Sequence, residues 1–339
     1  MRVTTVAVPQ CPSRLPLALP LNFALYRALG WRLLRPVLRT HDLVHSVDAF
    51  TGILSSHWAS RARIHHVHQV IGSDVNTILP RIVKSRSVAG WDRHLHGVAC
   101  VGRAVERSFR ALYPNVENVR TIYRGVNIGA FQPVGPMAGP LAARPPVRYL
   151  FLGGFPEYPT LPNRANTKGG ETLLEAWRMA EPEMAATNAS LLIAGPASES
   201  DRVRRWRAAL RQPERVHIGG LISPEAVAAY IRASDVVLLP SMEEGLPGVA
   251  VEASACGRAV FGSLVGGIPE VVVDRETGVL LPAGDVAAWK TALATYARRP
   301  SPLAAMGDSA RRRIGTFFNA DRYAPQLLNL YGAALSASL

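Results

Sequence analysis

The sequence predicts an α/β protein built from two domains, each a doubly wound parallel sheet covered by helices. Three observations support this prediction. Short apolar runs alternate with amphipathic helical patterns along residues 147–282, each run is apolar throughout, and a proline-rich segment at 131–147 divides the chain. Continuous apolar strands are typical of sheets buried on both faces, and strand–helix alternation is typical of parallel sheets.

The second half of the chain carries the clearer pattern. Ser223 and Glu225, for example, suit the start of a helix. The expected strands are 147–154, 190–195, 216–220, 235–240, 259–263 and 278–282, with expected helices at 169–180, 200–212 and 223–234. We therefore expect a C-terminal domain at 148–318, preceded by a linker at 134–147.

The first half is less regular, and we expect an N-terminal domain at 1–133. Its expected strands are 41–47, 63–71, 97–102 and 119–126, and its expected helices are 50–62, 77–90 and 102–113. His66 and His68 share one strand face while His65 lies opposite. This is poor geometry for a metal site, so buried or hydrogen-bonded histidines are expected there.

Charge is unevenly distributed between the two halves. Residues 1–140 hold 17 Lys and Arg against 6 Asp and Glu, a net charge of +11, whereas residues 141–339 hold 21 against 19. A well-solvated arginine surface is the simpler interpretation, and attraction to an anionic membrane or a phosphate-bearing partner is the alternative. A nucleic acid is a less favoured partner, because the basic residues are not interleaved with aromatic ones.

Residues 25–40 predict a basic amphipathic helix that kinks or ends at Pro36. Leu25, Leu29, Leu33 and Leu38 form one stripe, and Arg32, Arg35 and Arg39 lie on another face. A packed surface helix is the first interpretation, and contact with a membrane surface is the second. No apolar run reaches the roughly 18 residues of a membrane span. The three cysteines have no metal-site spacing and indicate buried thiols in a reducing compartment.

The stretch "SMEEGLPGVAVEASACG" carries the strongest functional signal. It follows the expected strand 235–240, and ligands of parallel sheets bind beyond the carboxyl ends of strands. Pro247 suits the first position of a helix, whose free N–H groups form an anion site. Glu244 lies before that helix and Glu252 on its second turn, so the two carboxylates flank the anion site and can each clamp vicinal hydroxyls.

A cation is needed to offset a diphosphate at such a site. The segment "PNRANTKGG" offers Arg164 and Lys168, in the loop that follows Gly153 and Gly154, where backbone can approach a ligand closely. Two carboxylates, a helix start and these cations together fit a sugar nucleotide.

The residues 239–285 resemble the donor site of family 4 glycosyltransferases, which have the GT-B fold. The family's E-x7-E motif matches Glu244 and Glu252, its "KG…LLEA" segment matches "KGGETLLEAW", and its "GG-x-PE" matches Gly266–Glu270. Its hinge entry matches "RGVNIGAFQP". The resemblance implies two Rossmann-like domains facing a cleft, with a C-terminal helix at 319–339 that packs back on the first domain.

The resemblance also implies roles for single residues. Glu252 would bind the ribose hydroxyls, Glu244 the donor sugar, and Lys168, with Arg164, the diphosphate. The remaining donor-binding positions would be Gly153, Gly154, Gly219, Gly245, Leu246 and Pro247. The implied reaction moves a hexosyl unit from a nucleotide-diphosphate sugar to an acceptor hydroxyl with retention of anomeric configuration. No metal or other cofactor is expected, and no D-x-D motif is present.

The chain departs from the family pattern in three places. Phe155 stands where the family usually has a phosphate-binding arginine, and Ile71 replaces the histidine of "HG-x-D". The acceptor side would then consist of Gly72, Ser73 and Asp74, with His68 as a compensating contact. Third, no glycine precedes Gly30, so the glycine-rich loop that opens the family's first domain is not matched and that domain is expected to be shortened.

These observations leave three functions open. The favoured one is a glycosyltransferase of polysaccharide or glycolipid synthesis, cytoplasmic or peripheral at the inner membrane face, with a lipid-linked sugar or a polysaccharide as acceptor. The alternative is a catalytically impaired sugar-nucleotide-binding partner protein, which the missing glycine loop would suggest. A glycoside hydrolase is disfavoured, because the glutamates flank a phosphate-type turn beside a lysine.

Overall fold

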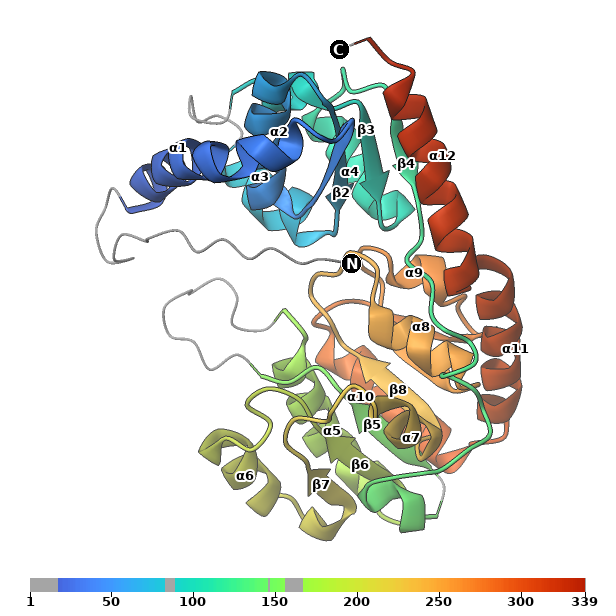
Figure 1. Ribbon diagram of the computed structural model, residues 1–339. Helices are drawn as coiled ribbons and strands as arrows, with labels where there is room; N and C mark the ends of the chain where they lie inside the picture. Colours follow the sequence, from blue (N-terminus) through green and yellow to red (C-terminus); the bar gives the residue numbers. More distant parts are fainter. Residues whose placement is uncertain (1–17, 83–88, 146, 156–166, 339) are drawn as a thin grey trace. The chain divides into compact units, whose positions relative to one another are not determined.

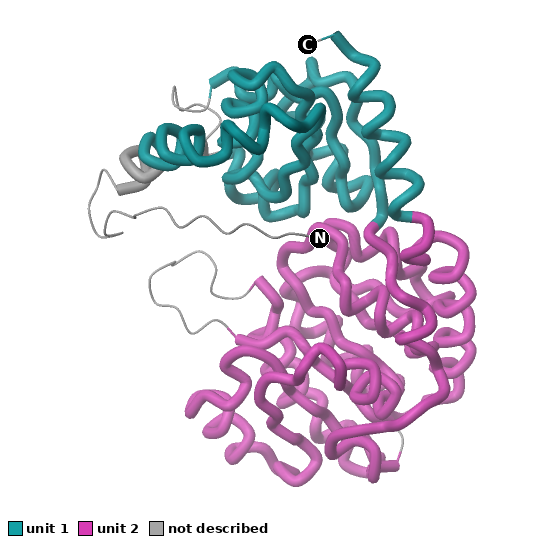
Figure 2. The backbone as a smooth tube through the Cα atoms, in the orientation of Figure 1, with its two compact units in different colours: residues 1–123, 323–339 teal, residues 124–322 magenta. Residues whose placement is uncertain are grey.

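The computed structural model describes residues 18–82, 89–145, 147–155 and 167–338 (Figure 1). They form two compact units (Figure 2). Unit 1 comprises Met1–Tyr123 and Tyr323–Leu339, and unit 2 comprises Arg124–Arg322. Each unit contains one sheet, and every strand pairing described in the two sheets is parallel. The α/β class predicted from the sequence is confirmed.

Unit 1 is built on a four-stranded sheet whose spatial order, β1-β2-β3-β4, follows the chain. The strands are β1 (Leu43–Val47), β2 (His65–Val70), β3 (Gly97–Cys100) and β4 (Val119–Thr121). The helices are α1 (Ala18–Leu38), α2 (Ala49–Ala62), α3 (Leu79–Ile82), α4 (Arg103–Leu112) and α12 (Tyr323–Leu335). Shorter helical turns lie at Asp74–Ile78 and Trp91–His94.

The last helix, α12, belongs to unit 1 although about 200 residues separate it from the other helices of that unit. It packs against β2 and β3, where Leu330 and Ala334 are buried with residues of the sheet. Two polar contacts fix its position. The Tyr323 hydroxyl donates to Gln69 Oε1 at 2.9 Å, and the Tyr331 hydroxyl lies 2.6 Å from His45 Nδ1.

Unit 2 contains a six-stranded sheet of order β10-β9-β8-β5-β6-β7. The strands are β5 (Arg148–Phe151), β6 (Ser190–Ile193), β7 (Val216–Ile218), β8 (Val236–Leu239), β9 (Ala259–Ser263) and β10 (Gly278–Leu281). The helices are α5 (Gly170–Met184), α6 (Asp201–Ala208), α7 (Val227–Arg232), α8 (Gly248–Ala255), α9 (Ile268–Val271), α10 (Val286–Arg298) and α11 (Pro302–Phe317). Short 3-10 turns lie at Pro140–Ala143, Pro213–Arg215 and Ala320–Arg322.

The strand order of unit 2 changes direction between β5 and β8. The chain builds outward from β5 through β6 to β7 (Figure 1). It then returns past β5 and builds outward on the other side through β8, β9 and β10. The loops that leave β5 and β8 therefore diverge. Such a switch point opens a crevice at the carboxyl end of the sheet, where ligands of doubly wound folds bind.

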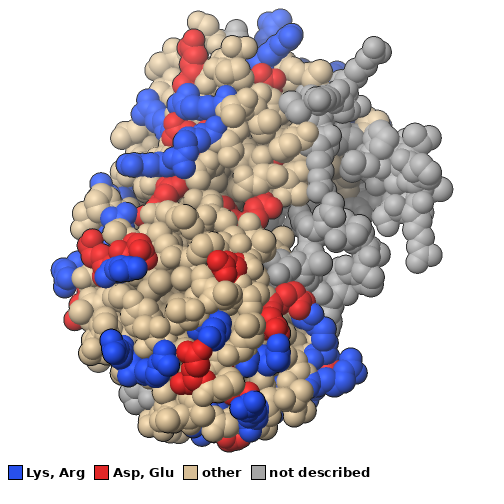
Figure 3. Space-filling view, turned by 180° about the vertical axis from the view of Figure 1, so that it is seen from behind, with Lys and Arg blue, Asp and Glu red and all other residues tan. Residues whose placement is uncertain are grey.

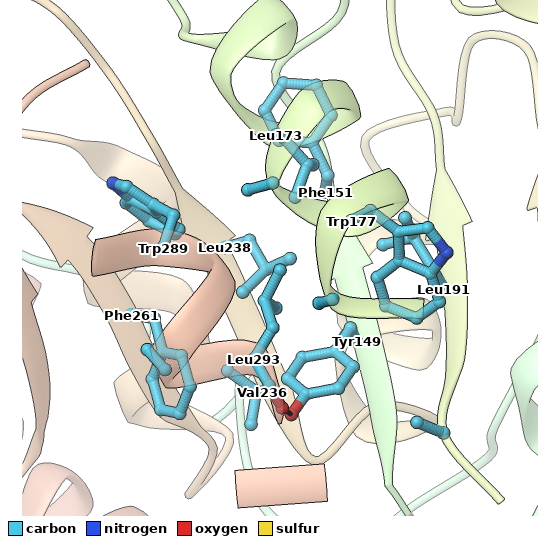
Figure 4. Close-up of a cluster of buried hydrophobic side chains, with 14 of the residues drawn as sticks. Tyr149, Phe151, Leu173, Trp177, Leu191, Val236, Leu238, Phe261, Trp289 and Leu293 are labelled. Atoms are coloured by element: carbon cyan, nitrogen blue, oxygen red, sulfur yellow. Dashed lines mark hydrogen bonds between the residues drawn. The ribbon is translucent and has the colours of Figure 1, made fainter. Parts of the chain in front are cut away.

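The core of unit 2 holds β5 against α5 and α10 (Figure 4). Tyr149 and Phe151 point from β5 into a cluster with Leu173 and Trp177 of α5, and all four side chains are buried. The Tyr149 hydroxyl donates to the carbonyl of Leu293 in α10 at 2.9 Å, so its polar atom is satisfied. This packing fixes the ends of β5 and α5, and thereby the loop between them.

The structure differs from the sequence prediction at three helices. Helix α1 begins at Ala18 and continues through Pro36 to Leu38, because a proline in the last turn removes only one helical hydrogen bond. The helix expected at 77–90 is a π-helical turn followed by α3, and residues 83–88 lie outside the described part of the chain. Helix α8 begins at Gly248, one residue later than expected, since Pro247 has an extended ψ of 108°.

In the described residues, no helix is both long enough and apolar enough to cross a membrane.

Candidate functional site

The predicted donor residues of unit 2 lie at the switch point of its sheet. Gly153 and Gly154 follow β5, Lys168 closes the loop that leads to α5, and Glu244 lies in the loop after β8. The two loops are joined by their backbones. The amide of Met242 donates to the carbonyl of Thr167 at 2.9 Å, which places the loop after β8 directly against the start of α5.

Gly169 makes this close approach possible. Its φ is +70°, and a Cβ built on it would lie 1.6 Å from the carbonyl oxygen of Pro240. Only glycine fits there, because any side chain would collide with backbone that cannot move aside. The preceding residue, Lys168, is consequently held beside the loop that carries Glu244.

Lys168 and Glu244 form an ion pair. Lys168 Nζ lies 2.7 Å from Glu244 Oε1, and the Ser241 hydroxyl donates to the same oxygen at 2.9 Å. The Glu244 side chain is 9% exposed, whereas that of Lys168 is 48% exposed. An arriving anion can therefore reach the Lys168 ammonium from solvent, while Ser241 holds the Glu244 carboxylate in place.

A third loop packs against the backbone of the segment that contains Glu244. A Cβ on Gly266, whose φ is +50°, would lie 1.8 Å from the carbonyl oxygen of Glu244, and a Cβ on Gly267 would lie 2.1 Å from that of Gly245. This loop follows β9, the neighbour of β8. The backbone around Glu244 is therefore enclosed by the loops that flank it on either side.

Glu252 lies on the second turn of α8 and is half-buried. Burial raises the pKa of its carboxyl group above the usual value. Among the described residues it has no ion-pair partner. A partly desolvated carboxylate without a cation is poised to accept hydrogen bonds from hydroxyl groups of a ligand.

The end of β5 is shaped by backbone contacts. Gly154 has a φ of +66°, and a Cβ on it would lie 2.5 Å from the carbonyl oxygen of Pro196. The amide of Phe155 donates to that oxygen at 2.6 Å, and its buried ring packs against Phe151. The guanidinium of Arg202 lies 5.5 Å from the centroid of the Phe155 ring. Phe155 thus completes the core at this position rather than offering a charge.

The other predicted donor residues share the same edge of the sheet. Gly219 follows β7 and donates its amide to the carbonyl of Ile193 at 2.9 Å. Gly245, Leu246 and Pro247 form the turn between Glu244 and α8. Arg164, the second predicted cation, lies outside the described residues.

The predicted acceptor residues belong to unit 1. Asp74 is fully buried, and its two oxygens accept the amides of Ala49 at 2.7 Å and Ile71 at 2.7 Å. It therefore ties the start of α2 to the end of β2. Gly72, with a φ of +113°, and the half-buried Ser73 form the adjoining turn.

His68 is fully buried in the core of unit 1. Its Nδ1 lies 2.9 Å from the Ser46 hydroxyl, and its ring meets the edge of Trp91. His66 Nε2 lies 2.7 Å from the same hydroxyl. Because the His68 ring is covered on all sides, it offers no exposed atom to a ligand. The described residues contain no group of histidine, cysteine, aspartate and glutamate side chains suited to a metal ion.

Sequence reasoning missed several residues that hold the donor loop in place. Ser241 had no signal, because a serine after a strand is common. Thr167 contributes only its carbonyl, which no sequence pattern reveals. Gly169, Gly266 and Gly267 stand in quoted motifs, and the structure supplies the reason: each lies against the backbone of a neighbouring loop.

Comparison with known proteins relates this site to a known family. Residues 154–313, which include every donor-loop residue from Gly154 to Glu252, match the family model "Glycosyl transferases group 1". This part of the chain belongs to that family. The protein is therefore a retaining glycosyltransferase that uses a nucleotide-sugar donor.

Curated relatives of this glycosyltransferase include two actinobacterial proteins named D-inositol 3-phosphate glycosyltransferase. The protein of Streptomyces coelicolor is 27% identical over 325 residues, which cover 88% of this chain and 70% of the relative. That of Xylanimonas cellulosilytica is 29% identical over 331 residues, covering 91% and 74%. The chain thus spans about 70% of the length of these relatives.

Solved structures confirm the GT-B fold of the glycosyltransferase. Anabaena HepE in complex with UDP aligns with a TM-score of 0.73 at 18% identity, covering 94% of this chain and 84% of HepE. A sucrose-phosphate synthase from Thermosynechococcus elongatus aligns with a TM-score of 0.71 at 23% identity, covering 97% and 81%.

Proposed function

We propose that this glycosyltransferase moves a hexosyl unit from a nucleotide-diphosphate sugar to an acceptor hydroxyl, with the donor held at the carboxyl end of the unit 2 sheet. One observation carries the proposal: the Lys168–Glu244 pair, 2.7 Å apart, lies at the switch point between β5 and β8. A cation and a carboxylate there fit the two ends of a sugar diphosphate, and switch points are the usual ligand sites of such sheets.

The residues of the site have distinct proposed roles. Lys168 neutralises the diphosphate and stabilises the charge that develops as it leaves the sugar. Glu244, freed from Lys168 but held by Ser241, accepts hydrogen bonds from the hydroxyls of the sugar. Glu252 accepts those of the ribose. Backbone amides near Gly154 and Gly245 donate to the phosphate oxygens.

Binding of UDP tests the assignment of Glu252. We expect isothermal titration calorimetry to show UDP binding to the wild type and at least tenfold weaker binding to E252Q, because an amide accepts fewer hydrogen bonds from vicinal hydroxyls. E276Q, at an exposed glutamate outside the site, is the matched control. Equal affinity of E252Q and E276Q for UDP would remove Glu252 from the donor site.

Transfer rates test the assignment of Lys168. We expect K168M to lower kcat/KM by about 10²–10³, since it removes a charge that stabilises the leaving diphosphate. K290M is the control, because Lys290 forms its ion pair with Glu183 away from the switch point. Comparable losses in K168M and K290M would indicate a general effect of lost charge and would contradict the proposed role.

As acceptor we propose a lipid-linked sugar or a growing polysaccharide at an anionic membrane surface, with α1 as the contact. In the described part of α1, Leu33 and Val37 are each 49% exposed, and Arg32, Arg35 and Arg39 are exposed beside them. Apolar side chains flanked by arginines suit the boundary of anionic headgroups. By contrast, basic and acidic side chains are interspersed over the described residues of the face in Figure 3.

Two assays separate the acceptor from the surface. Sedimentation with vesicles of phosphatidylglycerol and phosphatidylcholine should show binding only to the anionic vesicles, reduced by salt and by the double variant L33S/V37S. Transfer assays should compare a lipid-linked sugar, a polysaccharide and D-inositol 3-phosphate, the last being named in the relatives. Equal binding to both vesicles at all salt concentrations would exclude the membrane proposal and leave the donor site untouched.

A further inference from the structure

A cavity of unit 2 lies at the opposite end of the sheet from the donor site. Its volume is about 150 Å³, several times the roughly 30 Å³ that one water occupies in the liquid. Its walls come from the amino ends of β5, β8 and β9 and from the first turn of α11. The lining residues are Val147, Asp235, Gly257, Arg258, Pro300, Leu303 and Ala304.

Arg258 is chemically unusual among the residues that line this cavity. It directly precedes β9, and its backbone amide donates to the carbonyl of Ala253 at 2.9 Å, which fixes where the side chain starts. The Nε atom is buried and has no hydrogen-bond partner. A buried donor on a charged group that finds no acceptor is unfavourable, so a polar wall of this kind calls for a ligand that can accept a hydrogen bond.

The nearby carboxylate of Asp235 does not accept a hydrogen bond from Arg258 Nε. Asp235 accepts three hydrogen bonds from Arg148, from its backbone amide at 2.8 Å, its Nε at 3.0 Å and its Nη2 at 2.8 Å. Burial is the main cause that lowers the pKa of Arg258, the Asp235 carboxylate opposes this effect, and the positive charges of Arg148 and Arg232 add to it. Arg258 therefore lines a cavity whose one acid, Asp235, is already paired with Arg148, which leaves the charge of Arg258 in excess.

The start of α11 adds further donors. Pro302 has no N–H, and the amide of Leu303 donates to the carbonyl of Pro300 at 3.0 Å. Ser301, the N-cap, makes no side-chain hydrogen bond to the first turn. The next amide, of Ala304, falls among the N–H groups that have no partner within a helix, at the positive end of a 16-residue dipole.

We propose that this cavity is a binding site for a small phosphate-type oxyanion, held by the Arg258 guanidinium and the Ala304 amide at the start of α11. The planar edge of a guanidinium can give two parallel hydrogen bonds to such an anion, and the helix start complements its charge. The cavity adjoins Gly257 and the amino ends of the strands, whereas the donor loops leave the carboxyl ends of β5 and β8. The two sites are therefore distinct.

Thermal unfolding in sodium phosphate, against sodium chloride of equal ionic strength, tests the proposal. K168A serves as the background, because inorganic phosphate could also occupy the donor site. In that background we expect phosphate to raise Tm by about 2–4 °C at ten times its dissociation constant. R258Q should abolish the rise, and R299Q, at an exposed arginine next to the cavity, should retain it.

A second variant tests the same site without removing Arg258. Ala304 is exposed at the cavity wall, so A304E places a carboxylate where the anion would bind. We expect A304E to melt higher than its parent without phosphate and to show no further rise with it. A phosphate-dependent rise that persists in both R258Q and A304E, or that is absent from the K168A parent, would overturn the proposal.

Discussion

At the residue scale, Glu252 of the proposed donor site combines a binding role with an unfavourable effect on the stability of the free protein. Glu252 is half-buried without an ion-pair partner among the described residues, and burial raises its pKa. A carboxylate in this position is available to a ligand because the fold does not use it. The same property makes it a source of instability in the free protein.

We therefore predict that E252Q is more stable than the wild type at neutral pH. The folded pKa lies above the unfolded value of about 4.3, so the ionised group costs free energy of folding once the pH rises above that unfolded value. The gain in Tm should be full at pH 7 and should disappear near pH 4, where both states hold the proton. Differential scanning calorimetry at the two pH values measures it, and an equal gain at both would contradict the pKa argument.

At the element scale, the loops of unit 2 are positioned by glycines that lie against backbone. Gly266 is the clearest case, because its φ is +50° and a Cβ would lie 1.8 Å from the carbonyl oxygen of Glu244. We predict that G266A destabilises the protein by about 2 kcal/mol or more and weakens donor binding, since the Glu244 loop must move. Urea unfolding and UDP titration measure the two effects.

The matched control for G266A is G315A. Gly315 lies inside α11, and nothing stands within 4 Å of the position of its Cβ. Alanine there should stabilise the helix by up to about 1 kcal/mol. If both variants were destabilised alike, the loss in G266A could not be attributed to the contact with Glu244.

The strands β1 and β2 carry a pH-sensitive histidine cluster. His66 and His68 are buried around Ser46, and burial lowers both pKa values, that of His68 to about 3. Below pH 6.5 these histidines bind protons in the unfolded chain but stay neutral in the folded one. The free energy of unfolding is therefore highest above that pH and falls below it. Each histidine contributes about 1.4 kcal/mol per pH unit between its two pKa values.

We predict that unit 1 loses stability steeply between pH 6.5 and pH 5, and that H68Q makes this loss shallower. Urea unfolding monitored at several pH values gives the slope. H41Q, at an exposed histidine, should keep the wild-type slope. A wild-type slope in H68Q would show that His68 is not among the groups responsible.

At the scale of the whole molecule, unit 1 is assembled from two separated parts of the chain. Helix α12 buries Leu330 and Ala334 against β2 and β3 and anchors itself through Tyr323 and Tyr331. Its pattern shows an apolar face in the sequence, but periodicity cannot tell which sheet covers that face. That information resides in contacts between residues about 250 positions apart.

We predict that truncation after Arg322 destabilises unit 1 and spares unit 2. Removing α12 exposes the sheet face that Leu330 and Ala334 cover, so backbone amides of β2 and β3 should exchange with solvent far faster. Hydrogen exchange read by mass spectrometry follows both units in one sample. Equal protection of β2 and β3 with and without α12 would contradict the prediction. The milder Y331F should show a smaller change in the same peptides.

The sequence was sufficient for the strands of both units, because buried parallel strands are continuous apolar runs bounded by glycine and proline. It also located Lys168 and Glu244 at one edge of the sheet, since both follow strands. It could not reveal that they touch, because the contact depends on Gly169 lying against Pro240. Arg258 gave no signal at all, because no sequence pattern shows that its Nε is buried without a hydrogen-bond partner.

The split composition of unit 1 also bears on how the chain folds during synthesis. After Tyr123 has left the ribosome, about 200 residues of unit 2 must be made before α12 emerges. At about 5–20 residues per second this takes roughly 10–40 s. Throughout that interval one apolar face of the unit 1 sheet is uncovered while unit 2 is being synthesised. Helix α12 therefore completes unit 1 only after unit 2 has been synthesised, and chaperone demand should concentrate in that interval.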